Sequence, residues 1–263
     1  MIETSKTKRL VAVTLILILL TLVSSLAGLL NTDMYRPFIT GDFIPGIVSQ
    51  DMVSLAVAIG LFFVLRAMRR GSPRCAWIWS GLMAYLFYAY ALYAFDRIYT
   101  PFYPAYLAIF SLSLFGLGLL YTSLQPEALT LATYARQPRT LFASYLLINA
   151  VLFSISWAPR VIQAVHDKVQ PVGNTIFVLD FTIFIPLMVV GAVQIWKKTL
   201  LGHALTGLLL IKAGILGTSV FIGQLMMPHY GVAAEPWLTV LFGFLGIGGM
   251  ALSGLFLSRL EVN

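Results

Sequence analysis

The sequence predicts an all-α protein, a polytopic bundle of eight transmembrane helices that forms a single domain over residues 1–263. Apolar residues make up 59% of the chain and charged residues only 10%, against roughly 25% charged residues in soluble domains. The basic residues that give the net charge of +7 cluster in short loops between apolar runs. That pattern is typical of cytoplasmic loops in membrane proteins, so we expect a lipid bilayer and no nucleic acid as partner.

Eight apolar runs each approach the roughly 20 residues that a helix needs to cross a bilayer. They cover residues 10–30, 47–65, 76–95, 102–122, 140–158, 175–196, 203–226 and 237–257. The first run follows Lys6, Lys8 and Arg9 as in a signal peptide, but it exceeds the core of about 7–15 residues that signal peptides have. We therefore interpret it as a retained first span.

The distribution of Lys and Arg predicts that both termini are cytoplasmic. With that orientation twelve basic residues lie inside, four lie outside and Lys212 lies within a span, which accounts for all 17. The inner residues are Lys6, Lys8, Arg9, Arg66, Arg69, Arg70, Arg74, Arg136, Arg139, Lys197, Lys198 and Arg259, and the outer ones are Arg36, Arg97, Arg160 and Lys168. Tryptophan prefers the headgroup level, and Trp77, Trp79, Trp157, Trp196 and Trp237 all fall at predicted span ends.

Two loops are longer than the others. Residues 31–46 carry Pro37, Gly41, Pro45 and Gly46 and are expected to form an ordered outer turn. Residues 159–173 separate apolar from polar positions at helical spacing. This segment is either a short helix on the outer membrane surface or an irregular loop.

The chain also contains a pattern that suggests two parallel four-helix halves. Asp51 and Asp180 each precede an apolar run, a basic pair or triplet, and a small polar residue followed by Gly81 or Gly207. Parallel repeats occur in transporters, whose sites often lie where the repeats meet. A helix that runs inward and ends in basic residues produces part of this pattern by itself, so the duplication is a hypothesis.

Asp51, Asp180 and Lys212 are ionisable residues inside membrane spans. A charge at such a position costs roughly 2.5–3.5 kcal/mol or more and by default indicates a functional site with a partner. Asp51 is expected about one turn below the outer face, Asp180 about one and a half turns below it, and Lys212 close to the midplane. The structural alternatives are a carboxylate that caps a helix and a buried Lys–Asp pair that only fixes helix packing.

Further polar groups from several spans gather at the depth of the aspartates. Gln50, Gln224, Tyr88 and Tyr90 are expected to line an outward-facing cavity with Asp51, Asp180 and Lys212. Water or a ligand in such a cavity would solvate the carboxylates. Tyrosine is also enriched at membrane interfaces, so Tyr99, Tyr103 and Tyr106 are interpreted as an interfacial belt instead.

No motif in the chain indicates catalysis, a metal or a cofactor. Cys75 is the single cysteine and His166, His203 and His229 lack ligand spacing, so no catalytic residue, no metal site and no cofactor is expected. The glycines of the last two spans are interpreted as positions of close helix packing rather than hinges. They are Gly207, Gly214, Gly217, Gly243, Gly246, Gly248, Gly249 and Gly254.

Three short motifs resemble those of an uncharacterised family of prokaryotic multi-span integral membrane proteins. They are Gln50-Asp51-Met52-Val53, the segment from Ala84 to Tyr90, and Trp196-Lys197-Lys198 before Lys212-Ala213-Gly214. The resemblance implies the multi-span architecture and supports the choice of Asp51 and Lys212, and it implies no activity.

Three functions fit these observations, for a multi-pass protein of the cell (inner) membrane. The first is binding, and transport, of a small cationic or lipid-like ligand, because carboxylates beside tyrosines favour ammonium groups. The second is a structural or assembly subunit with membrane-protein partner subunits. The third is an intramembrane enzyme acting on a lipid or lipid-linked substrate, with Asp180 or Asp51 as general base and Lys212 or His229 as its partner.

Overall fold

The computed structural model describes residues 4–68, 74–123, 137–171 and 173–260, and within them every long element is helical. Eight helices are long and apolar enough to cross a membrane, as predicted. In order they are α1 (Thr4–Leu30), α2 (Ile44–Met68), α3 (Arg74–Phe95), α4 (Tyr103–Tyr121), α6 (Arg139–Asp167), the composite α7 (Asn174–Leu179) with α8 (Ile185–Trp196), α9 (Leu200–Met226) and α10 (Pro236–Ser258). The chain is therefore a multi-pass membrane protein.

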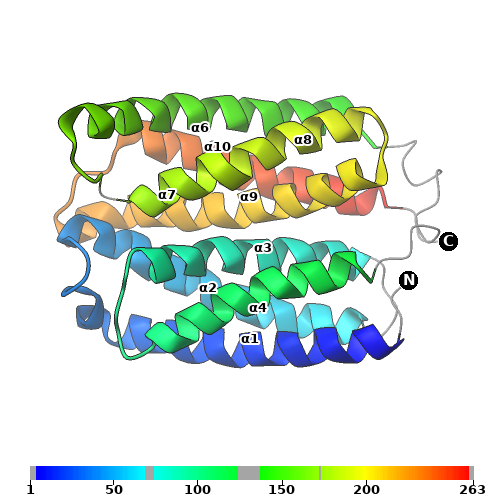
Figure 1. The fold of residues 1–263 in the computed structure, drawn as a ribbon, viewed down its shortest axis with the longest axis horizontal. Helices are drawn as coiled ribbons and strands as arrows, with labels where there is room; N and C mark the ends of the chain where they lie inside the picture. The colour runs from blue at the N-terminus through cyan, green and yellow to red at the C-terminus, as the bar shows by residue number, and fades with distance from the viewer. Residues whose placement is uncertain (1–3, 69–73, 124–136, 172, 261–263) are drawn as a thin grey trace.

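The helices form two groups of four that lie side by side. Figure 1 shows α1 to α4 in one group and α6 to α10 in the other, with α3 and α9 facing each other where the groups meet. The first residues of α1 and the last of α10 lie at the same end of the bundle, which we call the termini end. The grouping matches the expected four-helix halves, and their origin by duplication stays a hypothesis.

Helices α3 and α9 form the centre of the bundle. Within the most apolar 18-residue stretch of each span, 89% of the residues are buried in α3 and 72% in α9, against 50% or less in the other spans. The backbones come close at Gly81, where a Cβ atom would overlap the side chain of Ile211. Large apolar side chains of the outer helices, such as Phe63, Phe115 and Ile247, are exposed, as expected for a surface in contact with lipid.

Contact between α9 and α10 depends on glycine, as predicted, although Gly254 is an exception, because nothing lies within 4 Å of a Cβ atom there. A Cβ atom at Gly217 would overlap the backbone of Gly246, and one at Gly249 would overlap the backbone of Gly214. The two helices therefore touch backbone to backbone, which only residues without a side chain allow.

The segment after the fifth predicted span differs from both expectations. Residues 159–167 are helical, but they continue α6 to Asp167 without a break instead of forming a separate surface helix. Pro159 lies inside this helix, and Lys168 ends it with a left-handed φ of 54°. In the other long loop, residues 31–46, two short 3₁₀ helices, η1 (Thr32–Tyr35) and η2 (Gly41–Phe43), form the expected ordered turn.

The sixth span contains a wider turn at Asp180. Residues Asp180–Phe184 form a π-helical segment in which the N–H of Ile185 donates to the carbonyl of Asp180, five residues earlier. Pro186 follows at the start of α8; it has no N–H to donate, and its ring crowds the preceding turn of a regular α-helix. The π turn accommodates this proline, and such turns are frequent at functional sites.

Candidate functional site

The three buried charges lie in two separate clusters on either side of α3. Asp51 from α2 faces α1, α3 and the loop helix η1, whereas Asp180 and Lys212 lie among α3, α6 and α9. All three side chains are 2% exposed or less. The two clusters share α3, whose tyrosines point into both.

The Asp51 carboxylate is hydrogen-bonded on both oxygens. Tyr35 donates its hydroxyl to Oδ2 at 2.7 Å and Tyr93 donates to Oδ1 at 2.9 Å. Burial, and then the nearby Asp51 charge, raise the pKa of Tyr35 well above its ordinary value, so its hydroxyl stays a donor. A Cβ atom at Gly28 of α1 would overlap Asp51 Oδ2 and the Tyr35 hydroxyl, so this glycine makes room for the hydrogen bond.

More tyrosines enclose this first cluster. The Tyr90 hydroxyl lies 3.1 Å from the Ser25 hydroxyl of α1, and its ring stacks on Tyr93 at 5.4 Å between centroids. Tyr106 also packs on Tyr93, at 4.6 Å, and is only 1% exposed, so the interpretation of Tyr106 as part of an interfacial belt is wrong. Tyr99, at 55% exposure, is consistent with a belt position.

The Asp180 carboxylate is held on one oxygen only. Trp157 of α6 donates its indole N–H to Oδ2 at 2.9 Å. The other oxygen, Oδ1, is buried and accepts no hydrogen bond from the described residues. Tyr88 lies close enough to the carboxylate to act as a weak hydrogen-bond donor, and Lys212 lies close enough to interact with it electrostatically. Because it accepts no full hydrogen bond, Oδ1 is an open acceptor inside the bundle. A buried carboxylate oxygen in this state is costly, since buried polar groups are normally hydrogen-bonded.

Lys212 is held by aromatic rings. Its Nζ lies 3.5 Å from the ring centroid of Phe184 and 4.0 Å from that of Tyr88. Among the residues that the structure describes, no ion pair joins Lys212 to Asp180. Aromatic faces attract ammonium groups at such distances, particularly where water is excluded. The second cluster thus holds a cation of the protein itself against two aromatic rings.

Of the seven expected ligand-binding residues, the structure brings Asp180, Lys212 and Tyr88 together. Tyr90 lies with Asp51 in the first cluster. The two glutamines bond to the backbone: Gln50 donates to the carbonyl of Ala89 at 3.1 Å, and Gln224 accepts from the N–H of Glu235 at 3.1 Å.

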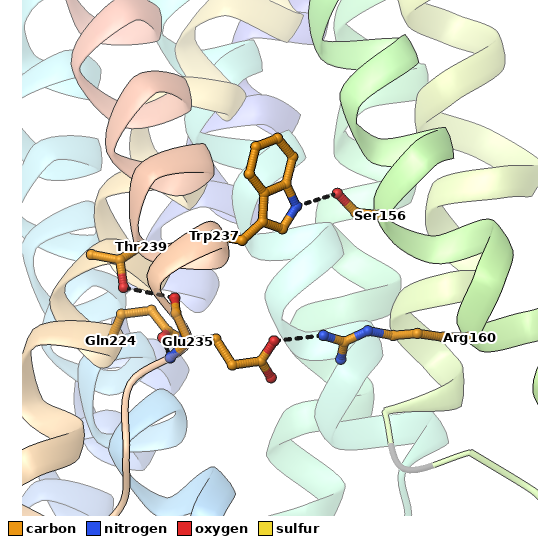
Figure 2. Close-up of polar contacts among 6 residues, drawn as sticks. All are labelled: Ser156, Arg160, Gln224, Glu235, Trp237 and Thr239. Atoms are coloured by element: carbon orange, nitrogen blue, oxygen red, sulfur yellow. Dashed lines mark hydrogen bonds and ion pairs between the residues drawn. The ribbon is translucent and has the colours of Figure 1, made fainter.

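Figure 2 shows the contacts that connect Gln224, the start of α10 and α6, and Figure 1 shows that α10 starts at the end of the bundle opposite the termini. Glu235 forms an exposed ion pair with Arg160 of α6 at 2.7 Å, and Trp237 donates to the Ser156 hydroxyl at 3.0 Å. These contacts hold the start of α10 against α6 on either side of Trp157 in the chain.

Sequence reasoning missed Trp157 and Phe184 in the second cluster and Tyr35 and Tyr93 in the first. Trp157 was interpreted as an interfacial residue, yet it is 4% exposed. Trp77 and Trp79 are also buried, and Trp79 donates to Thr14 at 2.9 Å, whereas Trp196 and Trp237 are about half exposed. A tryptophan at a span end can face lipid or the bundle, and no local signal in the sequence separates the two.

Asp96 lies at the end of α3 near the second cluster and was not identified from the sequence. It accepts a hydrogen bond from the Thr175 hydroxyl at the start of α7. Burial raises the pKa of Asp96, while the hydrogen bond from Thr175 lowers it. The contact links α3 to the helix that carries Asp180.

Comparisons of the chain with protein-family models, with curated proteins and with solved structures found no match. The resemblance to a family of multi-span membrane proteins therefore stays an expectation, and the candidate site rests on its own geometry.

Proposed function

We propose that the protein binds a small cation at Asp180, within the cell (inner) membrane, and carries it across in exchange for protons. The observation that supports this proposal is the carboxylate oxygen Oδ1, which has no full hydrogen bond from the described residues and lies near a cation that rests on two aromatic rings. A carboxylate with one unpaired oxygen can accept either a proton or a cation, and aromatic walls favour an ammonium.

Lys212 acts in this proposal as an internal competitor for the site. When no ligand is bound, its ammonium sits on the Phe184 and Tyr88 rings and partly compensates the Asp180 charge. An incoming cation displaces the Lys212 ammonium from the rings. This changes the charge around Asp180, and the change can be coupled to the uptake or release of a proton. The Asp51 cluster does not enter the cycle, because both oxygens of that carboxylate are already hydrogen-bonded.

The test is proton flux in liposomes that contain the purified full-length protein and an internal pH-sensitive dye. A gradient of tetramethylammonium, sodium or potassium is imposed across the wild-type membrane. We expect at least one of these cations to drive proton movement, and Asp180→Asn to reduce it to the rate in protein-free liposomes. Asp42→Asn, at an exposed position in η2, is the matched control and is expected to keep the wild-type rate.

Lys212→Met provides a second arm of the same experiment. Because the internal competitor is removed, the half-saturating concentration of the active cation is expected to fall. The expected decrease is roughly 5- to 150-fold, the range of affinity changes that typical coupling free energies produce. Wild-type flux that persists in Asp180→Asn would contradict the proposal. A wild-type protein without flux that copurifies with other membrane proteins would favour the assembly-subunit alternative, and turnover of labelled lipids would favour the enzyme.

A further inference from the structure

A hollow of about 290 Å³ lies at the end of the bundle opposite the termini, between the extension of α6 and the start of α7. The residues that line it are Arg160, Gln163, Ala164, Asp167, Val169, Pro171 and Phe177. Arg160, Gln163 and Asp167 are exposed, whereas Phe177 at the inner end is only 5% exposed. The hollow is therefore open to the surroundings and ends at an aromatic ring.

The same helix faces continue from this hollow to Asp180. On α6, Asp167, Ala164, Arg160 and Trp157 follow one another at three- and four-residue spacing, which places them on one face. On the opposing helix, Phe177 lies three residues before Asp180, one turn nearer the hollow. The two faces converge on the Asp180 carboxylate.

Aromatic rings connect the hollow to the carboxylate, because Phe177 lines the hollow and packs on Trp157, which bonds to Asp180. The rings of Trp157 and Phe177 lie 5.4 Å apart between centroids, and Trp157 donates to Asp180 at 2.9 Å. The guanidinium of Arg160, which lines the hollow, lies over the Trp157 ring, 5.6 Å from its centroid. Trp157 thus contacts a residue of the hollow and the buried acid at the same time.

The charges around the hollow are compatible with the entry of a cation. Arg160 is paired with Glu235 at 2.7 Å, which balances its charge, and Asp167 contributes a carboxylate to the lining (Figure 2 shows the Arg160–Glu235 pair). An exposed pair of this kind is worth only about 0.2–1 kcal/mol, so it does not close the hollow by itself.

We propose that this hollow is the entry to the Asp180 site and that Trp157 and Phe177 form the barrier that a cation passes. Trp157 is then a positioning residue: its N–H fixes one carboxylate oxygen, and its ring controls access to the other. The inference rests on the proposed function, but access can be measured without any ligand flux.

The test measures access to a cysteine placed beyond the barrier. The native cysteine is removed by Cys75→Ser, and Phe184→Cys places a thiol next to Lys212. A membrane-impermeant trimethylammonium-ethyl methanethiosulfonate is added to either side of membranes that contain the full-length protein. We expect labelling from the side of the hollow, and Trp157→Ala to raise its rate by at least roughly tenfold, which corresponds to ~1.4 kcal/mol.

Two variants make the result specific to this route. Trp237→Ala removes a neighbouring tryptophan that bonds to Ser156 and lies outside the lining, so it is expected to leave the labelling rate unchanged. Ala164→Trp fills the hollow and is expected to slow labelling, with or without the Trp157 substitution. This second variant tests the route even where Trp157→Ala fails to fold.

The proposal is overturned by labelling from the termini side, by labelling that Ala164→Trp does not slow, or by equal acceleration in Trp157→Ala and Trp237→Ala. None of these measurements depends on proton flux. A failed flux assay with the expected labelling would reject the proposed function and keep the route, and the reverse result would reject the route alone.

Discussion

The two buried aspartates differ in how their oxygens are satisfied, and this difference is the basis for the different roles that we propose for them. Asp51 accepts hydrogen bonds from Tyr35 and Tyr93, which tie the loop helix η1 and α3 to α2. Asp180 has one oxygen on Trp157 and one without a hydrogen-bond donor among the described residues. The first arrangement is typical of a structural carboxylate, and the second is the one that a ligand or a proton can complete.

The structural role proposed for Asp51 predicts a stability effect at Tyr93. Tyr93→Phe removes the donor to Asp51 Oδ1 and leaves a buried acceptor unpaired, which is expected to lower the unfolding free energy by about 1–3 kcal/mol. The measurement is a thermal or denaturant titration of the detergent-solubilised protein. Tyr99→Phe is the control, because its ring is 55% exposed and it does not contact Asp51. Equal stability of the two variants would show that the hydrogen bond contributes nothing.

At the scale of the elements, the spans were predicted well and their irregularities were not. Most predicted ends agree with the structure to within three residues, because the apolar length required by a bilayer is a strong constraint on sequence. The extension of α6 to Asp167 was interpreted as a separate segment, since its polar residues and Pro159 interrupt the apolar run. The π turn at Asp180 has no hydropathy signal, although Pro186 marks its position.

The glycine contact between α9 and α10 leads to a prediction about packing. Gly217→Ala would push a methyl group into the backbone of Gly246, and overpacking of this kind is expected to cost about 1–3 kcal/mol of unfolding free energy. The control is Gly254→Ala on α10, where nothing lies within 4 Å of the added atom.

The control substitution is expected to leave stability unchanged or to raise it by about 0.5–1 kcal/mol, because alanine is the better helix former. Thermal unfolding of the two variants in the same detergent distinguishes them. A Gly217→Ala protein as stable as the Gly254→Ala protein would mean that α9 and α10 separate easily and that their close contact is not required.

At the scale of the whole molecule, both ends of the described chain lie at one end of the bundle, as an even number of spans requires. The distribution of Lys and Arg predicts that this end is cytoplasmic. Arg69, Arg70 and Arg136, which contribute to that distribution, lie outside the described residues, and so does the side chain of Lys6. The orientation therefore stays a prediction.

Cysteine labelling in intact cells tests the orientation. In the Cys75→Ser background, Gln170→Cys marks the end that carries the hollow and Ser258→Cys marks the termini end; both positions are exposed. An impermeant maleimide is expected to label Gln170→Cys in intact cells and Ser258→Cys only after permeabilisation. The Cys75→Ser chain without a new cysteine is the control, and the reverse pattern would invert the topology.

The sequence by itself determined the fold class, the eight spans and the burial of three charges, because lipid admits only long apolar helices and makes every exception conspicuous. Only the tertiary structure decided which of the buried charged and polar residues share a site. Tyr88 and Tyr90 are two residues apart, about 200° around a helix, and so face different clusters. Trp157 meets Asp180 from another helix, 23 residues away in the chain. Hydropathy specifies how deep a residue lies in the bilayer, whereas rotation about the helix axis and the choice of neighbouring helix depend on packing across the whole bundle.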